Sequence, residues 1–216
     1  MTESTTIEAP PARLRAASIA VEDDPIPIVR LLARSLRDAS VCTPDATAVL
    51  VGTVVVRSHD TPQAATLICT PGVVEVTAGA LDEPDATVVV DLNARFATTQ
   101  ESAGNAELAD GVLRALRTPV PDWRESAARF WEVTRDIPGI PDVLVVKAAG
   151  PDGVEHGRFG DGPTSYVVAG PADLLAGVFS GADDFLVSLA AGVQVQGTLS
   201  QLSVMTAASW RVRFDV

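Results

Sequence analysis

The chain has 216 residues, a formal net charge of −12, 47% hydrophobic residues and 20% charged residues. This length accommodates one large domain or two domains of about 100 residues each, and the hydrophobic fraction excludes a wholly disordered chain. The negative charge opposes binding to nucleic acid, and no apolar run is long enough for stable membrane insertion, so we expect a cytoplasmic protein.

The chain contains two histidines and two cysteines. Cys42 and Cys69 lack the close spacing of a metal knuckle and do not make a disulfide framework, so both are predicted to be reduced thiols. His59 and His156 stand beside turn residues and outside any nucleophile motif, so we expect both to be exposed in loops. These observations predict no catalytic residue, no metal site, no cofactor and no enzymatic activity.

Residues 1–24 mix Thr, Ser, Glu, Pro and Ala and end in an acidic run at residues 22–24. Such a composition is typical of a flexible arm, which we predict for this segment. The alternative is a docking segment, in which Leu14, Ile19 and Val21 lie along the surface of a protein partner or of a second copy of the chain.

Residues 25–120 are predicted to form a first module. Apolar residues recur at helical spacing over residues 26–39, which predicts an amphipathic helix. Runs rich in Val and Thr then predict four strands, which we expect to form an antiparallel meander, at residues 46–57, 64–70, 73–78 and 86–91. Residues 92–117 return to a helical pattern that is broken near Gly104, and Asn105 is expected to cap its second part.

The order of elements repeats in residues 121–216, the predicted second module. Asp122 is expected to cap a helix, and three strands, two short helices and one more strand are predicted after it, at residues 123–136, 142–148, 154–159, 164–169, 171–179, 183–191 and 193–197. A last helical or mixed segment is expected from Leu199 onward, and within it the alternation of Trp210, Val212 and Phe214 with charged residues has the period of a strand. The fold class predicted is α+β, with each half an antiparallel sheet covered by short helices in a degenerate tandem repeat.

The predicted helix at residues 123–136 carries Trp123, Phe130 and Trp131 on one broad face. We expect this aromatic face to join the two halves of the chain. Contact of the same face with a partner chain is the alternative.

Two polar motifs in the second half have ordinary structural explanations. Gly157, Gly160 and Gly162 precede a predicted strand, whereas a phosphate-binding loop needs a helix after it, so hairpin turns are expected here. Asp183 and Asp184 are candidates for paired carboxylates or a cation site. Acidic residues are favoured at the start of a helix, so we expect both to open the helix at residues 183–191.

Residues 164–202 resemble the type two sterol carrier protein family. The resemblance rests on a strand, two short helices, a strand closed by Gly and a final helix, represented by Tyr166-Val-Val168, Ala172-Asp-Leu-Leu175 with Phe179 and Gly181, Asp184-Phe-Leu186 with Leu189 and Gly192, and Val193-Gln-Val-Gln-Gly197 followed by Leu199 and Leu202. The first half matches less completely, because no Val-x-Val-x-Gly strand follows Arg117.

This resemblance implies α+β modules that hold fatty acids, sterols, acyl-CoA or similar lipids in a tunnel between sheet and helices, without chemistry on them. By position, the residues that would bind the ligand are Leu174, Leu175, Phe179, Phe185, Leu186, Leu189, Val193 and Val195, with Leu199, Leu202 and Met205 as a lid. An ordinary packed core explains the same residues. We therefore expect non-catalytic binding or carriage of a hydrophobic ligand, with a scaffold or accessory protein that has a closed cavity as the alternative.

Overall fold

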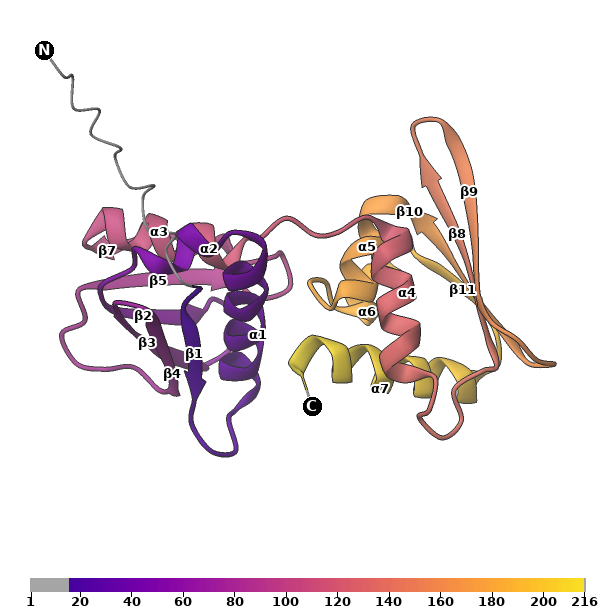
Figure 1. The fold of residues 1–216 in the computed structure, drawn as a ribbon, viewed down its shortest axis with the longest axis horizontal. Helices are drawn as coiled ribbons and strands as arrows, with labels where there is room; N and C mark the ends of the chain where they lie inside the picture. Colours follow the sequence, from indigo (N-terminus) through magenta and orange to yellow (C-terminus); the bar gives the residue numbers. More distant parts are fainter. Residues whose placement is uncertain (1–15, 216) are drawn as a thin grey trace, which may run out of the picture.

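The computed structural model describes residues 16–215, which form two lobes lying side by side (Figure 1). We call residues 16–118 the first lobe and residues 119–215 the second lobe. The described residues form one sheet of seven strands and one of four, and both sheets mix parallel and antiparallel pairs. The α+β class is therefore confirmed, but the purely antiparallel sheets that we expected are wrong.

The first lobe contains a seven-stranded sheet with three helices. Its elements are β1 (Ser18–Val21), α1 (Pro27–Cys42), α2 (Pro44–Ala48), β2 (Gly52–Ser58), β3 (Ala64–Thr70), β4 (Val73–Ala78), β5 (Ala86–Asp91), β6 (Ala97–Thr98), β7 (Ala103–Gly104) and α3 (Ala106–Leu116). The strand order is β1-β4-β3-β2-β5-β6, with β7 also paired to β5.

The first sheet is not the meander that we predicted, because β5 pairs with β2 instead of β4. β2 runs antiparallel to β3 but parallel to β5. The connection at residues 79–85 carries the chain back past β3 and β2, so that Val88 and Val90 join Val54 and Val56 in one core. Strand periodicity indicates which face of a strand is buried, and it does not identify the neighbouring strand.

The N-terminal arm begins to be ordered earlier than expected. Residues 18–21 form β1, which pairs in parallel with β4, and Ile19 and Val21 pack partly against the first core instead of a partner. The boundary of the flexible arm at residue 24 is therefore wrong. Leu14, which belongs to the docking alternative, lies outside the described residues.

Two further segments of the first lobe differ from the sequence prediction. The strand predicted at residues 46–57 starts at Gly52, because α2 occupies its first part. The helix predicted from residue 92 starts at Ala106, since residues 97–98 and 103–104 pair with β5 as short strands. The cap at Asn105 is confirmed, because its side-chain oxygen accepts a hydrogen bond from the Leu108 N–H at 3.1 Å.

The second lobe contains the four-stranded sheet and four helices. Its elements are α4 (Trp123–Thr134), β8 (Val143–Gly150), β9 (Gly153–Gly160), β10 (Ser165–Pro171), α5 (Ala172–Ser180), α6 (Phe185–Ala190), β11 (Gln194–Gln196) and α7 (Leu199–Phe214). The order is β11-β10-β8-β9, with β8 antiparallel to β9 and parallel to β10. The cap at Asp122 is confirmed by hydrogen bonds from the N–H groups of Arg124 and Glu125 at 2.7 and 3.1 Å.

The helical segment expected from Leu199 onward is confirmed, since residues 199–214 form the single helix α7, and the strand indicated by the alternation from Trp210 is wrong. A capping box between Thr198 and Gln201 starts this helix. Val212 packs against the core of the second lobe, whereas Phe214 packs against the core of the first. The apolar alternation thus reflects a helix that contacts a different lobe on each of two faces.

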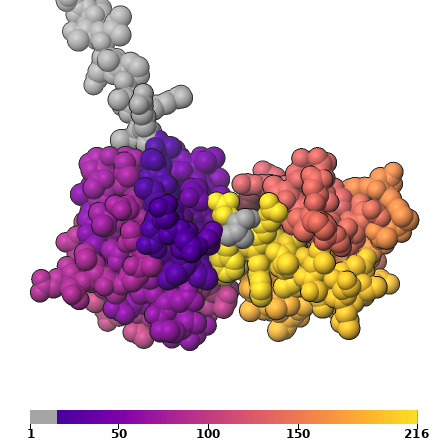
Figure 2. Space-filling view, turned by 90° about the horizontal axis from the view of Figure 1, so that it is seen from below, coloured from indigo at the N-terminus to yellow at the C-terminus, as the bar shows by residue number. Residues whose placement is uncertain are grey.

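The helices of the two lobes face each other across the joint (Figure 1). Helix α7, shown in yellow in Figure 2, lies against the first lobe, where it contacts α1. The two lobes also share one pairing pattern, in which a helix precedes an antiparallel hairpin and a later strand returns parallel to the first strand of that hairpin. No helix within residues 16–215 is both long and apolar enough to cross a membrane.

Candidate functional site

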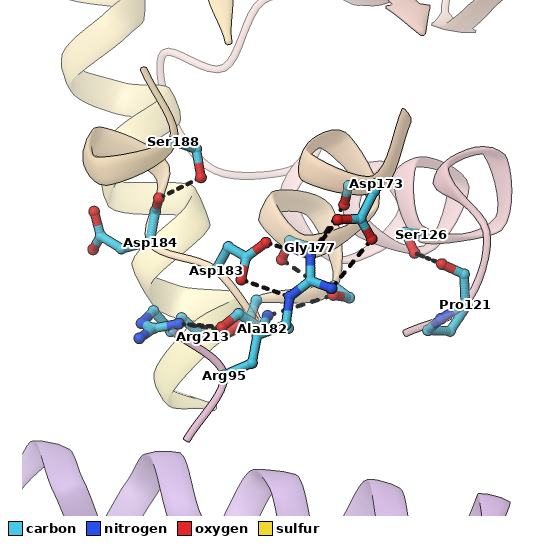
Figure 3. A network of polar contacts seen from close by, with 12 residues as sticks. Arg95, Pro121, Ser126, Asp173, Gly177, Ala182, Asp183, Asp184, Ser188 and Arg213 are labelled. Atoms are coloured by element: carbon cyan, nitrogen blue, oxygen red, sulfur yellow. Dashed lines mark hydrogen bonds and ion pairs between the residues drawn. The ribbon is translucent and has the colours of Figure 1, made fainter. Parts of the chain in front are cut away.

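Polar contacts of arginine side chains join the two lobes (Figure 3). Arg95, which follows β5, donates to both carboxylate oxygens of Asp183 at 2.8 and 2.6 Å and to Asp173 at 3.2 Å. Arg213 of α7 donates to the carbonyl oxygen of Leu92 at 2.6 Å and to that of Ala182 at 2.8 Å. The joint is therefore held by charged hydrogen bonds as well as by apolar packing.

Burial changes the electrostatics of this network. Arg213 is only 2% exposed, and this burial lowers its pKa to about 10, so the side chain remains charged at neutral pH. The hydrogen bonds that Arg95 donates to Asp183 are the main reason that the pKa of Arg95 is raised. Both arginines therefore stay protonated across the physiological range.

The two neighbouring acids Asp183 and Asp184 have different roles. Asp184 caps α6, since its side chain accepts hydrogen bonds from the N–H groups of Leu186 and Val187 at 2.9 and 3.0 Å. Asp183 lies one residue before that cap and pairs with Arg95 instead. The expectation that both acids open the helix is wrong for Asp183, whose role depends on an arginine 88 residues away.

A pocket of about 550 Å³ lies between the lobes, and we call it the interlobe pocket. Its lining comes from α1, the segment after β5, the end of α3, the connection between the lobes, α4, the end of α5 and the end of α7. The apolar part of the lining consists of Val41, Phe96, Leu116, Pro119, Val120, Pro121, Phe130, Val133, Phe179, Ala182 and Val212. This volume falls within the usual range of small-molecule sites, about 300–1,000 Å³.

The interlobe pocket is also rich in positive charge. Three acidic residues, Asp38, Glu125 and Asp215, line it together with six arginines, which are Arg34, Arg37, Arg95, Arg117, Arg129 and Arg211. This is an excess of three positive charges in a chain whose formal net charge is −12. The pocket therefore differs in sign from the protein as a whole.

Some of the pocket arginines are already paired. Arg34 contacts Asp38 at 3.2 Å and donates to the carbonyl oxygen of Ser180 at 2.7 Å, and Arg37 contacts Asp215 at 2.7 Å. Arg95 pairs with Asp183 and Asp173. The remaining three pocket arginines, Arg117, Arg129 and Arg211, make no ion pair with a carboxylate among residues 16–215. Arg117 donates to the carbonyl oxygen of Phe96 at 3.0 and 2.7 Å, so Arg129 and Arg211 are the pocket arginines whose guanidinium groups are available to a ligand.

Arg34 has a polar atom without a partner. Its Nε is buried and makes no hydrogen bond within the described part of the chain. Burial is the main reason that the pKa of Arg34 is lowered; Asp38 opposes this effect and Arg129 adds to it. Arg34 and Arg129 are thus close enough to repel each other.

Most of the residues predicted to bind a ligand lie elsewhere. Leu175, Phe179, Phe185, Val193 and Met205 are buried in the core of the second lobe, and Leu174, Leu189, Val195 and Leu202 are half-buried against it. Leu186 is 45% exposed and Leu199, expected in the lid, is 83% exposed. Phe179 alone among these residues lines the interlobe pocket.

The aromatic residues of α4 belong mainly to the second lobe. Trp123 and Phe130 are buried in its core, and Trp131 packs against that core. The expectation that this face joins the two halves is therefore wrong for the tryptophans, whereas Phe130 also lines the interlobe pocket. Contact of α4 with a partner chain stays a prediction.

The two histidines are exposed, whereas the two cysteines differ in exposure. His59 and His156 are exposed, but His156 lies on strand β9 and not in a loop. Cys42 is exposed and lines the interlobe pocket, while Cys69 is buried in the first core, where burial raises its pKa to about 11. Residues 16–215 contain no group of three or more His, Cys, Asp and Glu side chains suited to a metal ion.

Sequence reasoning did not find the interlobe pocket, because its lining is drawn from residues that range from Arg34 to Asp215. The nearest signal was the row formed by Arg30, Arg34 and Arg37 on one face of the first helix. Such a row is typical of the polar side of the amphipathic helix predicted at residues 26–39, and a polar side of this kind ordinarily faces solvent. Comparison with protein-family models, with curated proteins and with solved structures finds no match to this chain.

Proposed function

We propose that this protein binds or carries a hydrophobic ligand, such as a fatty acyl chain, in the interlobe pocket and performs no reaction on it. The observation that carries the proposal is a pocket of about 550 Å³ whose apolar side chains come from both lobes. The predicted lining in the second lobe is less suitable, because its most buried members, including Leu175 and Phe185, are part of a packed core.

Burial of an acyl chain in such a pocket gives sufficient affinity without chemistry. Each buried methylene group contributes about 0.8 kcal/mol, and a Kd in the micromolar range corresponds to about 8 kcal/mol. Around ten methylene groups therefore reach this affinity before the cost of ordering the ligand is subtracted.

The resemblance to sterol carrier proteins supports the same class of ligand. It rests on the segment 164–202, and the pairing pattern shared by the two lobes favours the tandem arrangement that we predicted. Under this proposal, two related modules enclose the ligand between them instead of each holding a ligand in its own tunnel.

A binding experiment tests the proposal. Delipidated protein is expected to take up a fluorescent fatty acid saturably, and Val133→Trp is expected to weaken the uptake by filling the pocket. Val133 is 52% exposed, so this change leaves the core intact, and Val154→Trp on β9 is a matched control because Val154 is 58% exposed and outside the pocket lining. The absence of saturable uptake refutes the proposal.

A second arm of the same experiment locates the ligand. Leu189 lies among the residues predicted from the family resemblance and not in the interlobe pocket lining. If Leu189→Arg abolishes uptake in a folded protein while Val133→Trp has no effect, the ligand occupies the second lobe and the interlobe location is wrong.

The second candidate function is that of a scaffold or accessory protein. Leu186, Val187 and Trp210 are all exposed on α6 and α7, and the Trp210 Nε1 donates to Asp184 at 3.2 Å, which places the indole beside the start of α6. Exposed apolar side chains that lie together are typical of protein contacts. Light scattering that shows a dimer, lost on Trp210→Ser, favours this candidate.

A further inference from the structure

We propose that the ligand of the interlobe pocket carries an oxyanion head group on its apolar chain, and that Arg34, Arg129 and Arg211 bind this head group. The inference deepens the proposed function and rests on it. The shared chemistry is that of a carboxylate or a phosphate monoester, both of which present several acceptor oxygens to guanidinium groups.

Positive charge is concentrated at the interlobe pocket. Six of the chain's 16 basic residues line a single pocket, against three acidic ones, although acidic residues outnumber basic ones by 28 to 16 in the chain. An apolar ligand gains nothing from this arrangement. An anionic ligand is attracted to it, because a cleft with low-dielectric walls strengthens the local field.

The positive charge of Arg34 is incompletely compensated in the described part of the chain. A buried N–H of a charged group without an acceptor is costly, and the structure supplies no acceptor to this Nε from the described residues. Arg129 brings a second positive charge near Arg34, which adds to the cost of leaving the pair without an anion. Arg34 and Arg129 both line the interlobe pocket, so an anionic group bound there offsets this repulsion.

Contacts across the joint account for the positions of some arginines and not of others. Arg37, Arg95 and Arg213 are explained by their contacts across the joint, with Asp215, Asp183 and the Leu92 carbonyl oxygen respectively. Arg129 and Arg211 are exposed at the pocket and make no such contact among residues 16–215. They are therefore the arginines whose placement the joint itself does not require.

Isothermal titration of the full, delipidated chain with three probes of equal chain length tests the inference. The probes are dodecanoate, dodecyl phosphate and dodecanol. We expect at least one anionic probe to bind about tenfold tighter than the alcohol, because a charge-assisted hydrogen bond provides at least this ratio. Whichever anion binds tighter identifies the head group, and its advantage over the alcohol is expected to shrink at high salt.

Variants assign the head group to the arginines. Arg129→Gln and Arg211→Gln are expected to weaken the anionic probe about tenfold and to leave dodecanol unchanged. Arg34→Gln is expected to have a larger effect, but this variant also loses a contact with Ser180, so the two exposed arginines decide the test. Arg114→Gln is the matched control, because Arg114 is exposed on α3 outside the pocket lining.

Protection of Cys42 from a maleimide reports the place of binding. Cys42 lines the pocket and is exposed, while the buried Cys69 serves as the internal unreactive thiol. Protection by the anionic probe supports the inference.

Equal affinity for acid, phosphate and alcohol overturns the head-group inference but leaves the proposed function standing. Failure of all three probes to bind overturns both.

Discussion

Arg95 and Asp183 form a two-pronged ion pair across the joint, with Nε–Oδ1 and Nη2–Oδ2 distances of 2.8 and 2.6 Å. The partners come from different lobes, since Arg95 follows β5 and Asp183 precedes α6. Asp183 is buried, with 8% of its surface exposed, so the hydrogen bonds from Arg95 replace contacts with water at its carboxylate. This pair is therefore one of the contacts that hold the lobes, and with them the walls of the interlobe pocket, in place.

Asp183→Asn is therefore expected to destabilise the protein by about 2–3 kcal/mol, because it removes a charged hydrogen-bond acceptor and leaves Arg95 underpaired. The free energy of unfolding from a urea titration measures this loss. Glu155→Gln breaks the exposed pair of Glu155 with Arg124, and we expect it to cost less than about 1 kcal/mol. Equal losses in the two variants contradict a special role for Asp183.

Gly177 of α5 is expected to tolerate no side chain. A Cβ atom at this position overlaps the carboxylate of Asp183 and lies 2.6 Å from Nη2 of Arg95. Gly177→Ala is thus expected to lower the melting temperature, although alanine favours a helix over glycine by about 1 kcal/mol. Gly111→Ala in α3 is the control, because its Cβ meets only the end of the Leu50 side chain. A higher melting temperature for Gly177→Ala refutes the prediction.

Tyr166 of β10 is fully buried, and its hydroxyl makes no hydrogen bond within the described residues. This burial raises the pKa of Tyr166 to about 12. Tyr166→Phe is expected to leave stability unchanged or to raise it by up to about 1 kcal/mol, since it removes an unsatisfied polar group from the core. Tyr166→Ala is expected to cost about 3–5 kcal/mol through the cavity that it leaves. A clear loss of stability in the phenylalanine variant indicates a partner for the hydroxyl.

Local elements of this fold follow from short-range patterns. The predicted strands at residues 64–70, 73–78 and 86–91 have the same bounds as β3, β4 and β5, because alternation and turn residues act within a few positions. The caps at Asn105 and Asp122 were predictable for the same reason, since a cap bonds to N–H groups two or three residues ahead.

Long-range features did not follow from such patterns. The pairing of β2 with β5 depends on the path of residues 79–85 across the sheet, and α7 presents a strand-like alternation because two lobes cover it. Predicting the interlobe pocket requires both the strand pairing of the first sheet and the position of α7 between the lobes. Arg34 and Arg129 line one pocket only because the lobes lie together, and no local spacing relates two residues that are 95 positions apart.

The contribution of Asp142 to stability is expected to depend on pH. The Asp142 carboxylate accepts hydrogen bonds from the N–H and hydroxyl of Thr164, at 2.9 and 2.6 Å, and the hydroxyl bond is the main reason that the pKa of Asp142 lies below its usual value of 3.8. A carboxylate with a lowered pKa in the folded state stabilises the fold above pH 3.8, and this contribution disappears as the pH falls through its folded value. Asp142→Asn is therefore expected to lower the melting temperature at pH 7 and to make a smaller difference in acid, at pH values below the lowered pKa of Asp142. Asp152→Asn is the control, because the Asp152 side chain in the β8–β9 turn makes no hydrogen bond among residues 16–215. A difference between wild type and Asp142→Asn that is the same at both pH values contradicts the assignment.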